Sequence, residues 1–226
     1  MTQAHYHLLE SYMLRCMCDS AHDAQHIYRV LNHALQIAET EPETDLDVLI
    51  AACLLHDIGR QDQLRDPAVC HAQVGSRKAY EFLQEAGFSK EFCRHVADCI
   101  YTHRFRKAEP PKTLEAKILF DADKLDVTGA VGIARSLMYK AEVAEPLYLL
   151  RPDGTVDDGS QDTGPSFFRE YKFKLEKLYD RFYTPRGAEL ARQRQQTAVD
   201  FYQALYREVS DGYAAGRIAL EKLLEE

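Results

Sequence analysis

The sequence has no apolar run near the roughly 18 residues that a membrane-spanning helix requires. Its first residues also lack the apolar segment of a secretory signal peptide. We therefore expect a soluble, cytoplasmic protein. With 226 residues, 46% of them hydrophobic, the chain can bury a substantial core as one large domain or as a domain with an extension.

The chain has fewer basic than acidic residues: 28 Lys and Arg against 36 Asp and Glu, which gives a formal net charge of −8. Nonspecific binding to nucleic acid depends on a basic surface that neutralises phosphates. The composition therefore argues against a general nucleic-acid-binding protein. It still allows a small anionic substrate, held by a few cations gathered at one site.

Paired cysteines at zinc-finger spacing are also missing. Of the 6 cysteines, Cys16 and Cys18 form a C-x-C without a second pair, and Cys53 lies inside an apolar run. A small buried hydrophobic side chain is the usual role of such a cysteine. In a cytosolic protein, we expect reduced thiols that take no part in catalysis.

Neither an alternating strand pattern nor an internal repeat is present. Apolar residues instead recur at intervals of three and four, which predicts an all-α protein. The expected helices cover residues 5–18, 21–38, 45–58, 71–86, 89–103, 113–125, 129–144, 167–182 and 186–224. Loops are expected at 60–69 and at 151–165, the second being acidic and long enough to be functional or mobile.

The pair His56-Asp57 closes the apolar stretch 48–55. This stretch is apolar all round, as expected of a helix at the centre of a bundle, and Gly59 suits a left-handed C-cap. An ionised carboxylate at the negative end of a buried helix costs several kcal/mol if it is unpaired. Either a bound cation or a nearby Arg or Lys can offset that cost.

His26, His56, Asp57 and Asp123 come from three predicted helices. Metal sites in helical bundles are commonly built from inward side chains of facing helices, and imidazole with carboxylate suits Mn, Fe and Zn. Taken singly, His26 is more often a surface histidine, and Asp123 a cap or a salt-bridge partner.

The chain resembles the HD-domain metal-dependent phosphohydrolases, whose ligands occur in the order H…HD…D. The matching segments are HDAQHIYRV from His22, AACLLHDI from Ala51 and DADKLD from Asp121. THRF, DADKLDVTGAVGIAR and KLEKLY also look like sequences of the stand-alone bacterial members. The resemblance covers nearly the whole chain. It implies an HD-domain helical bundle with a C-terminal helical extension: one unit over 1–226, with a metal-binding core at about 20–130 and the extension at about 131–226.

By this resemblance, His26, His56, Asp57 and Asp123 bind one divalent cation, which could be Mn, Mg, Co, Ni, Fe or Zn. Asp121 is the alternative to Asp123, because two residues on a helix separate their directions by about 200° and one ion cannot readily take both. The resemblance also makes His71 and His103 candidates for a second metal or for contact with phosphate.

Cations near these ligands are candidates for binding a phosphorylated substrate. They are Arg29, Arg60, Arg104 and Lys124. Each could instead neutralise a buried carboxylate.

The expected reaction is hydrolysis by metal-activated water. His56 and Asp57 belong to the catalytic set, and Asp23, His103 or His22 would manage protons. The resemblance favours nucleotides as substrates, by pyrophosphohydrolase or nucleotidase action. Two alternatives stay open: a di-iron oxygenase of HD type, and a regulatory module that binds nucleotides without turnover. A homodimer is possible.

Overall fold

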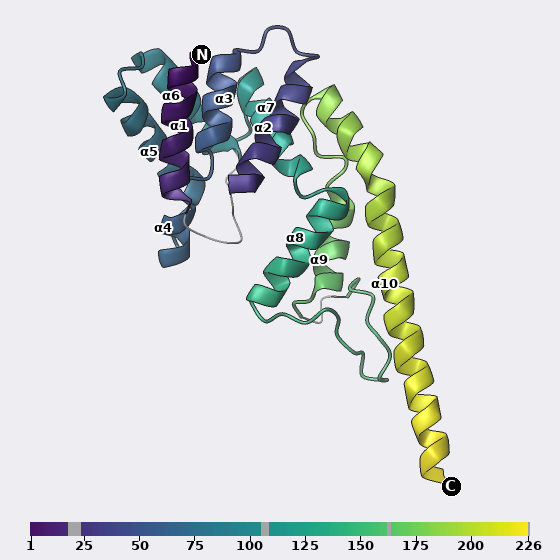
Figure 1. Cartoon of the computed structure of the whole chain (residues 1–226). Helices are drawn as coiled ribbons and strands as arrows, with labels where there is room; N and C mark the ends of the chain where they lie inside the picture. Colours follow the sequence, from purple (N-terminus) through teal and green to yellow (C-terminus); the bar gives the residue numbers. More distant parts are fainter. Residues whose placement is uncertain (18–23, 105–108, 162–163, 226) are drawn as a thin grey trace. The chain divides into compact units, whose positions relative to one another are not determined.

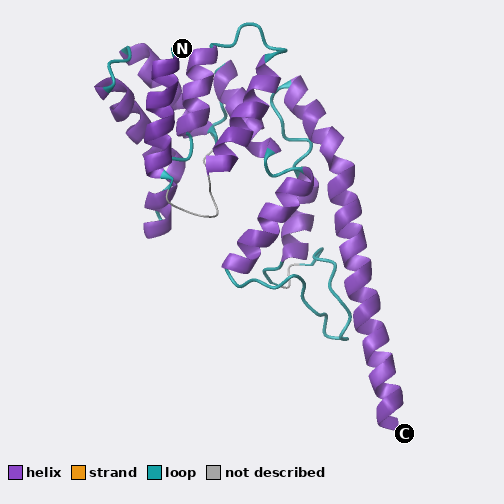
Figure 2. Ribbon diagram, viewed as in Figure 1, coloured by secondary structure: helices purple, strands orange, loops and turns teal. Residues whose placement is uncertain are grey.

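The computed structural model describes residues 1–17, 24–104, 109–161 and 164–225. Within these ranges the chain is helical and contains no strand; one isolated antiparallel bridge joins Leu150 and Val156 (Figure 2). The all-α prediction is therefore confirmed. None of the described helices is long and apolar enough to cross a membrane.

The chain forms two compact units. The first contains Met1–Asp126 together with Phe182–Glu189, and the second contains Val127–Arg181 with Leu190–Glu226. All the described residues that were predicted to form the site belong to the first unit.

The first unit is organised around helix α3 (Leu46–Leu55), which packs against four neighbours (Figure 1). These neighbours are α1 (Gln3–Cys16), α2 (Ala24–Ala38), α6 (Lys90–Thr102) and α7 (Leu114–Leu125). Helix α5 (His71–Glu85) packs on α6. From Val48 to Leu55, every α3 side chain except Ile50 is buried, as expected of a helix without a polar face.

Side-chain caps set the beginnings of α3, α6 and α7, as the Thr2 hydroxyl does for α1. The Asp45 carboxylate accepts hydrogen bonds from the Asp47 and Val48 amides and so caps α3. The Ser89 hydroxyl accepts from the Phe92 amide, and the Thr113 hydroxyl from the Ala116 amide. Each cap satisfies amides that the first helical turn leaves without a partner.

Two local predictions fail between α3 and α5. Gly59 has φ −91°, so it is not a left-handed C-cap. It is needed for close approach instead, because a Cβ there would lie 2.2 Å from the His71 carbonyl oxygen. The segment expected to be a loop at 60–69 begins with a short helix, α4 (Arg60–Arg65).

The second unit contains α8 (Gly129–Glu142), α9 (Phe167–Phe173), a 3-10 turn (Leu175–Lys177) and the part of α10 (Pro185–Glu225) after Glu189. Aromatic side chains form its core, where Tyr171 stacks on Tyr202 with ring centroids 4.0 Å apart. The predicted helix 167–182 is wrong, because α9 ends at Phe173. The amides of Tyr183 and Thr184, just beyond that range, donate to a side chain rather than to helical carbonyls.

Candidate metal centre

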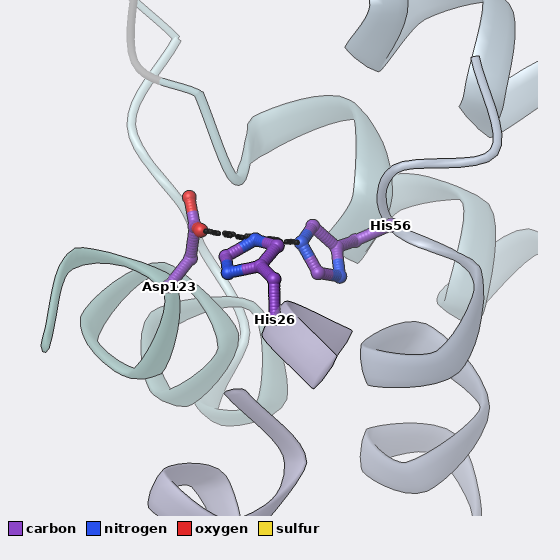
Figure 3. Close-up of side chains that lie close together, drawn as sticks. All are labelled: His26, His56 and Asp123. Atoms are coloured by element: carbon purple, nitrogen blue, oxygen red, sulfur yellow. Dashed lines mark hydrogen bonds and ion pairs between the residues drawn. The ribbon is translucent and has the colours of Figure 1, made fainter. Parts of the chain in front are cut away.

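Three side chains from three helices meet in the first unit (Figure 3). His26 lies on α2, His56 follows the last residue of α3, and Asp123 lies on α7. His26 Nε2 lies 3.3 Å from His56 Nε2 and 3.3 Å from Asp123 Oδ1, and His56 Nε2 lies 3.9 Å from the same oxygen. We call these residues the first ligand group.

A second ligand group lies beside the first and consists of Asp57, His71 and His103, all buried. Asp57 Oδ1 lies 3.4 Å from His71 Nε2 and 3.7 Å from His103 Nε2, while the two imidazole Nε2 atoms are 3.3 Å apart. His71 begins α5 and His103 follows α6, so two more elements contribute to the same region.

Asp57 connects the two groups. Its Oδ2 lies 3.7 Å from His26 Nε2 and 3.8 Å from His56 Nε2, whereas its Oδ1 faces the second group. One carboxylate therefore has an oxygen directed at each set of imidazoles. Such an arrangement suits a carboxylate shared between two cations.

Hydrogen bonds at Nδ1 determine which imidazole nitrogen faces inward. His56 Nδ1 donates to the Cys53 carbonyl at 2.8 Å, and His103 Nδ1 donates to the Ile100 carbonyl at 2.6 Å. A carbonyl only accepts, so Nδ1 carries the proton and the Nε2 of each neutral ring carries a lone pair. Both rings use a carbonyl of the helix end that lacks a helical partner.

The other two imidazoles are fixed by side chains. His26 Nδ1 donates to Asp126 Oδ2 at 2.7 Å, and His71 Nδ1 donates to Gln63 Oε1 at 2.5 Å. Partners of this kind orient metal-ligating histidines and make them better ligands. All four rings thus direct Nε2 toward Asp57 or its neighbours.

This geometry fits divalent cations. In the second group the two imidazole Nε2 atoms approach to 3.3 Å and both carry lone pairs, which is unfavourable unless something positive lies between them. Asp57 Oδ2 is buried, and no described residue donates a hydrogen bond to it. A buried carboxylate oxygen without a donor is costly unless a cation compensates it. His26, His56, Asp57 and Asp123 could hold one ion, and Asp57, His71 and His103 another.

Burial and charge set the protonation of the ligands. Burial lowers the pKa of His56 to about 4 and that of His71 to about 2, so both rings are neutral at pH 7, as metal ligands must be. Burial also opposes a charge on His26, but its hydrogen-bonded carboxylates, Asp123 and Asp126, raise its pKa to about 9. A proton and a cation therefore compete for His26 Nε2.

Both aspartates are held in the ionised form. Burial favours a neutral Asp57, but Arg60 and the neighbouring histidines bring its pKa well below the usual value. Burial acts in the same direction on Asp123, where the hydrogen bond and the charge of His26 lower the pKa. Negative charge is thus available for a cation.

The four candidate phosphate-binding cations have different surroundings. Arg60 Nε donates to Asp57 Oδ1 at 3.0 Å, and Arg29 Nε donates to Asp126 Oδ1 at 2.6 Å, so both neutralise buried carboxylates. The Lys124 ammonium lies 4.0 Å from the centroid of the Phe120 ring. Arg104 is nearest to the second ligand group, with Nη1 2.8 Å from His71 Nδ1.

Asp121, the alternative ligand, is directed elsewhere. Its buried carboxylate accepts hydrogen bonds from the Tyr183 amide at 2.9 Å, the Thr184 amide at 2.7 Å and the Thr184 hydroxyl at 2.7 Å. Asp123 is the aspartate that faces His26. His22 and Asp23, expected to manage protons, lie outside the described residues.

Sequence reasoning missed two supporting residues, Asp126 and Gln63. Asp126 lies three residues after Asp123, and so within the matched DADKLD segment, which was a usable signal. Gln63 lies in the segment expected to be a loop. No sequence pattern marks it as a partner of His71.

Comparisons with known proteins agree with this geometry. The model of the HD domain family matches residues 23–128. The uncharacterized protein YpgQ of Bacillus subtilis is 30% identical over 194 residues, which cover 84% of this chain and 85% of YpgQ. The 3'-5' exoribonuclease YhaM of the same species is 30% identical over 118 residues, but these cover 46% of this chain and 37% of YhaM.

Solved structures give similar relatives. The crystal structure of YpgQ in complex with ADP has a TM-score of 0.71 and 28% sequence identity, and the alignment covers 90% of this chain and 97% of that one. The structure of a predicted HD superfamily hydrolase from an uncultured Thermotogales bacterium has a TM-score of 0.60 and 29% identity, with coverage of 91% and 92%.

Proposed function

Since the chain belongs to the HD-domain family of metal-dependent hydrolases, we propose that it hydrolyses phosphate anhydride or ester bonds of nucleotides. The observation that carries this proposal is the sharing of Asp57 between two ligand groups, each with two inward imidazole nitrogens.

We assign one cation to His26, His56, Asp57 and Asp123, and a second to Asp57, His71 and His103. Divalent cations held there supply Lewis acidity, which makes water nucleophilic at neutral pH and stabilises charge on phosphoryl oxygens. Asp57 fixes the position of the two ligand groups relative to each other, because each of its carboxylate oxygens faces one group. As a ligand, His103 has no second lone pair with which to move a proton, so Asp23 is the better candidate for that role.

Arg104 is the best placed cation for a substrate phosphate. Its Nη1 contacts both His71 Nδ1 and Gln63 Oε1, at 2.8 and 3.1 Å. When His71 donates its Nδ1 proton to Gln63, that nitrogen cannot accept from Arg104. Arg104 Nη1 then donates to Gln63 Oε1, and the guanidinium remains a fixed positive charge beside the second ligand group, where it would stabilise charge in the transition state.

A nucleotide is the substrate class that the comparisons support best, because the related YpgQ binds ADP in its crystal structure. Activity should be measured with purified protein, each of Mn, Mg and Co, and a panel of nucleoside mono-, di- and triphosphates. We expect release of phosphate or pyrophosphate from at least one class, and none from Asp57→Asn prepared in the same way. Absence of product with every metal would reject the hydrolase proposal for this panel.

An HD-type di-iron oxygenase is the second candidate, favoured by one observation. Four imidazoles and a shared carboxylate also suit a pair of irons. The two proposals differ in what Mn can do, since an oxygenase needs iron and consumes oxygen. Nucleotide hydrolysis by the Mn form, without oxygen uptake by the iron form, would exclude the oxygenase.

A further inference from the structure

A pocket of about 210 Å³ lies in the first unit, between the segment that follows α4 and the end of α6. Its wall combines apolar and hydrogen-bonding groups. The residues that bear on its chemistry are Gln63, Val69, Gln73, Tyr101, Arg104 and Glu109.

The pocket adjoins the second ligand group on the Nδ1 side of His71. Gln63 and Arg104 line it, and both contact His71 Nδ1, at 2.5 and 2.8 Å. A molecule that occupies the pocket would therefore lie beside Arg104, next to the second ligand group.

Three polar side chains in the pocket have unused hydrogen-bonding groups. In the described part of the chain, the Gln73 amide, the Tyr101 hydroxyl and the Glu109 carboxylate make no hydrogen bond. Tyr101 is 39% exposed and Gln73 is exposed on α5, so neither is held by packing in the core. The aromatic ring offers a stacking face, and the amide and carboxylate offer both donors and acceptors.

This chemistry matches a planar heterocycle better than a phosphate or a metal. Among the described residues that line the pocket, which do not include 105–108, Arg104 is the one cation, and Glu109 would repel an anion. For a transition metal the described lining offers only one thiol, that of Cys70, and one carboxylate beside weakly ligating amide and phenol groups, which is too few for a metal site. Binding sites for small molecules typically combine an apolar wall with a few placed polar groups, as here.

We infer that this pocket binds the base of the nucleotide substrate, with Tyr101 stacking on the ring and Gln73 and Glu109 hydrogen-bonding its edge. The inference rests on the proposed function, because it places the phosphates at the two ligand groups. Arg104 then lies between the base and the ligand groups, on the side of the phosphates.

Equilibrium binding tests this placement without requiring turnover. The Mn-loaded protein is titrated with ADP and, as a base-free probe, with pyrophosphate, in wild type, Gln73→Ala, Tyr101→Ala and Gln84→Ala. Gln84→Ala is the matched control, since Gln84 is an exposed glutamine of the same helix outside the pocket. Stacking of one base on an aromatic ring corresponds to an affinity change of about tenfold.

We expect Tyr101→Ala to weaken ADP binding about tenfold and Gln73→Ala to weaken it by a smaller factor. Pyrophosphate binding should be unchanged in both variants. Gln84→Ala should bind both probes as the wild type does. Unchanged ADP affinity in both pocket variants would overturn the inference. Equal weakening of ADP and pyrophosphate would also overturn it, because the pocket would then act on phosphate. Failure of the proposed function is a separate result: bound nucleotide without hydrolysis.

Discussion

Asp126 illustrates how a residue outside the ligand set shapes the site. Its carboxylate accepts from His26 Nδ1 at 2.7 Å and from Arg29 Nε at 2.6 Å, while itself almost fully buried. The hydrogen bond to His26 directs Nε2 of His26 toward Asp57 and Asp123. Arg29 lies against this carboxylate and compensates its negative charge.

Replacement of Asp126 by Asn should weaken metal binding at the first ligand group by about 10- to 100-fold. The Asn amide can donate to His26 Nδ1, which would move the ring proton to Nε2 and remove a ligand. Isothermal titration calorimetry with Mn measures the change in metal affinity. Asp98→Asn, an exposed aspartate on α6, is the control. If Asp126→Asn bound Mn with wild-type affinity, the Asp126 carboxylate would not be what positions His26.

Asp121 and Asp123 should respond oppositely to removal of their side chains. Asp121→Ala leaves the buried Thr184 amide without its acceptor, so we expect a loss of about 1–3 kcal/mol in the free energy of unfolding with metal content retained. Asp123→Ala should lose metal. Elemental analysis and urea denaturation separate the two effects. Metal loss in Asp121→Ala alone would reverse the assignment of the ligand.

Much of the candidate site could be predicted at the residue scale, because His26, His56, Asp57 and Asp123 occur in a recognisable order. The sharing of Asp57 could not, since it depends on where α5 and α6 place His71 and His103. His103 bonds the Ile100 carbonyl at three residues' distance, as His56 bonds that of Cys53. That parallel is visible only in three dimensions.

At the scale of elements, the junction of α3, α4 and α5 positions the second ligand group. Gly59 lies against the first turn of α5, where an added Cβ would be 2.2 Å from the His71 carbonyl oxygen and 2.7 Å from the Gly75 amide nitrogen. Both contacts are with backbone, which cannot move aside as a flexible side chain does. The close approach of α5 therefore depends on this glycine.

Gly59→Ala should lower the free energy of unfolding by about 1–3 kcal/mol, the usual cost of overpacking, and should displace His71. Thermal unfolding of the metal-free protein measures the first effect, and Mn titration measures the second. In Gly212→Ala the new methyl group meets open space, so this control should be neutral or slightly stabilising. Equal behaviour of the two variants would contradict the packing argument.

The contact between α1 and α2 should depend on pH. Glu10 Oε1 accepts from the Tyr28 hydroxyl at 2.7 Å and from the Tyr6 hydroxyl at 2.8 Å. These hydrogen bonds, first that of Tyr28 and then that of Tyr6, lower the pKa of Glu10 below its usual value of 4.5. Because the pKa of Glu10 is lower in the folded than in the unfolded protein, its ionised carboxylate stabilises the fold at pH values above the unfolded-state pKa. This stabilisation is lost as the pH falls through the folded-state pKa.

Glu10→Gln should therefore destabilise the metal-free protein by about 1 kcal/mol at pH 7, and this difference should shrink as pH falls below about 4.5. Urea denaturation from pH 7 to pH 3 measures it. Glu43→Gln, at an exposed position without a hydrogen-bonded partner among the described residues, serves as control. A difference that does not vary with pH would show that ionisation of Glu10 contributes nothing.

Helix positions were predictable where periodicity and caps agree, as in α5 and α7, which lie within a residue or two of their expected bounds. Prediction failed where tertiary contacts decide. The break after Phe173 lies in an amphipathic stretch that continues the helical spacing, so local sequence gives no reason for it. The prediction that Gly59 is a left-handed C-cap was wrong because two different requirements, close backbone approach and a positive φ, both favour glycine.

At the scale of the whole molecule, the residues that bear on the candidate site belong to the first unit, which also takes residues 182–189 from near the C-terminal part of the chain. Asp121 holds that segment through amides 62 and 63 positions away in sequence. Such a contact leaves no periodic pattern, so it could not be predicted.

The most direct test of the two-cation assignment is the number of Mn ions bound per chain after loading and removal of excess metal. We predict two ions in wild type and one each in His56→Ala and His71→Ala, because each variant damages a different ligand group while Asp57 remains. Asp57→Asn should hold less than either. One ion in wild type, kept in His71→Ala and lost in His56→Ala, would contradict the account.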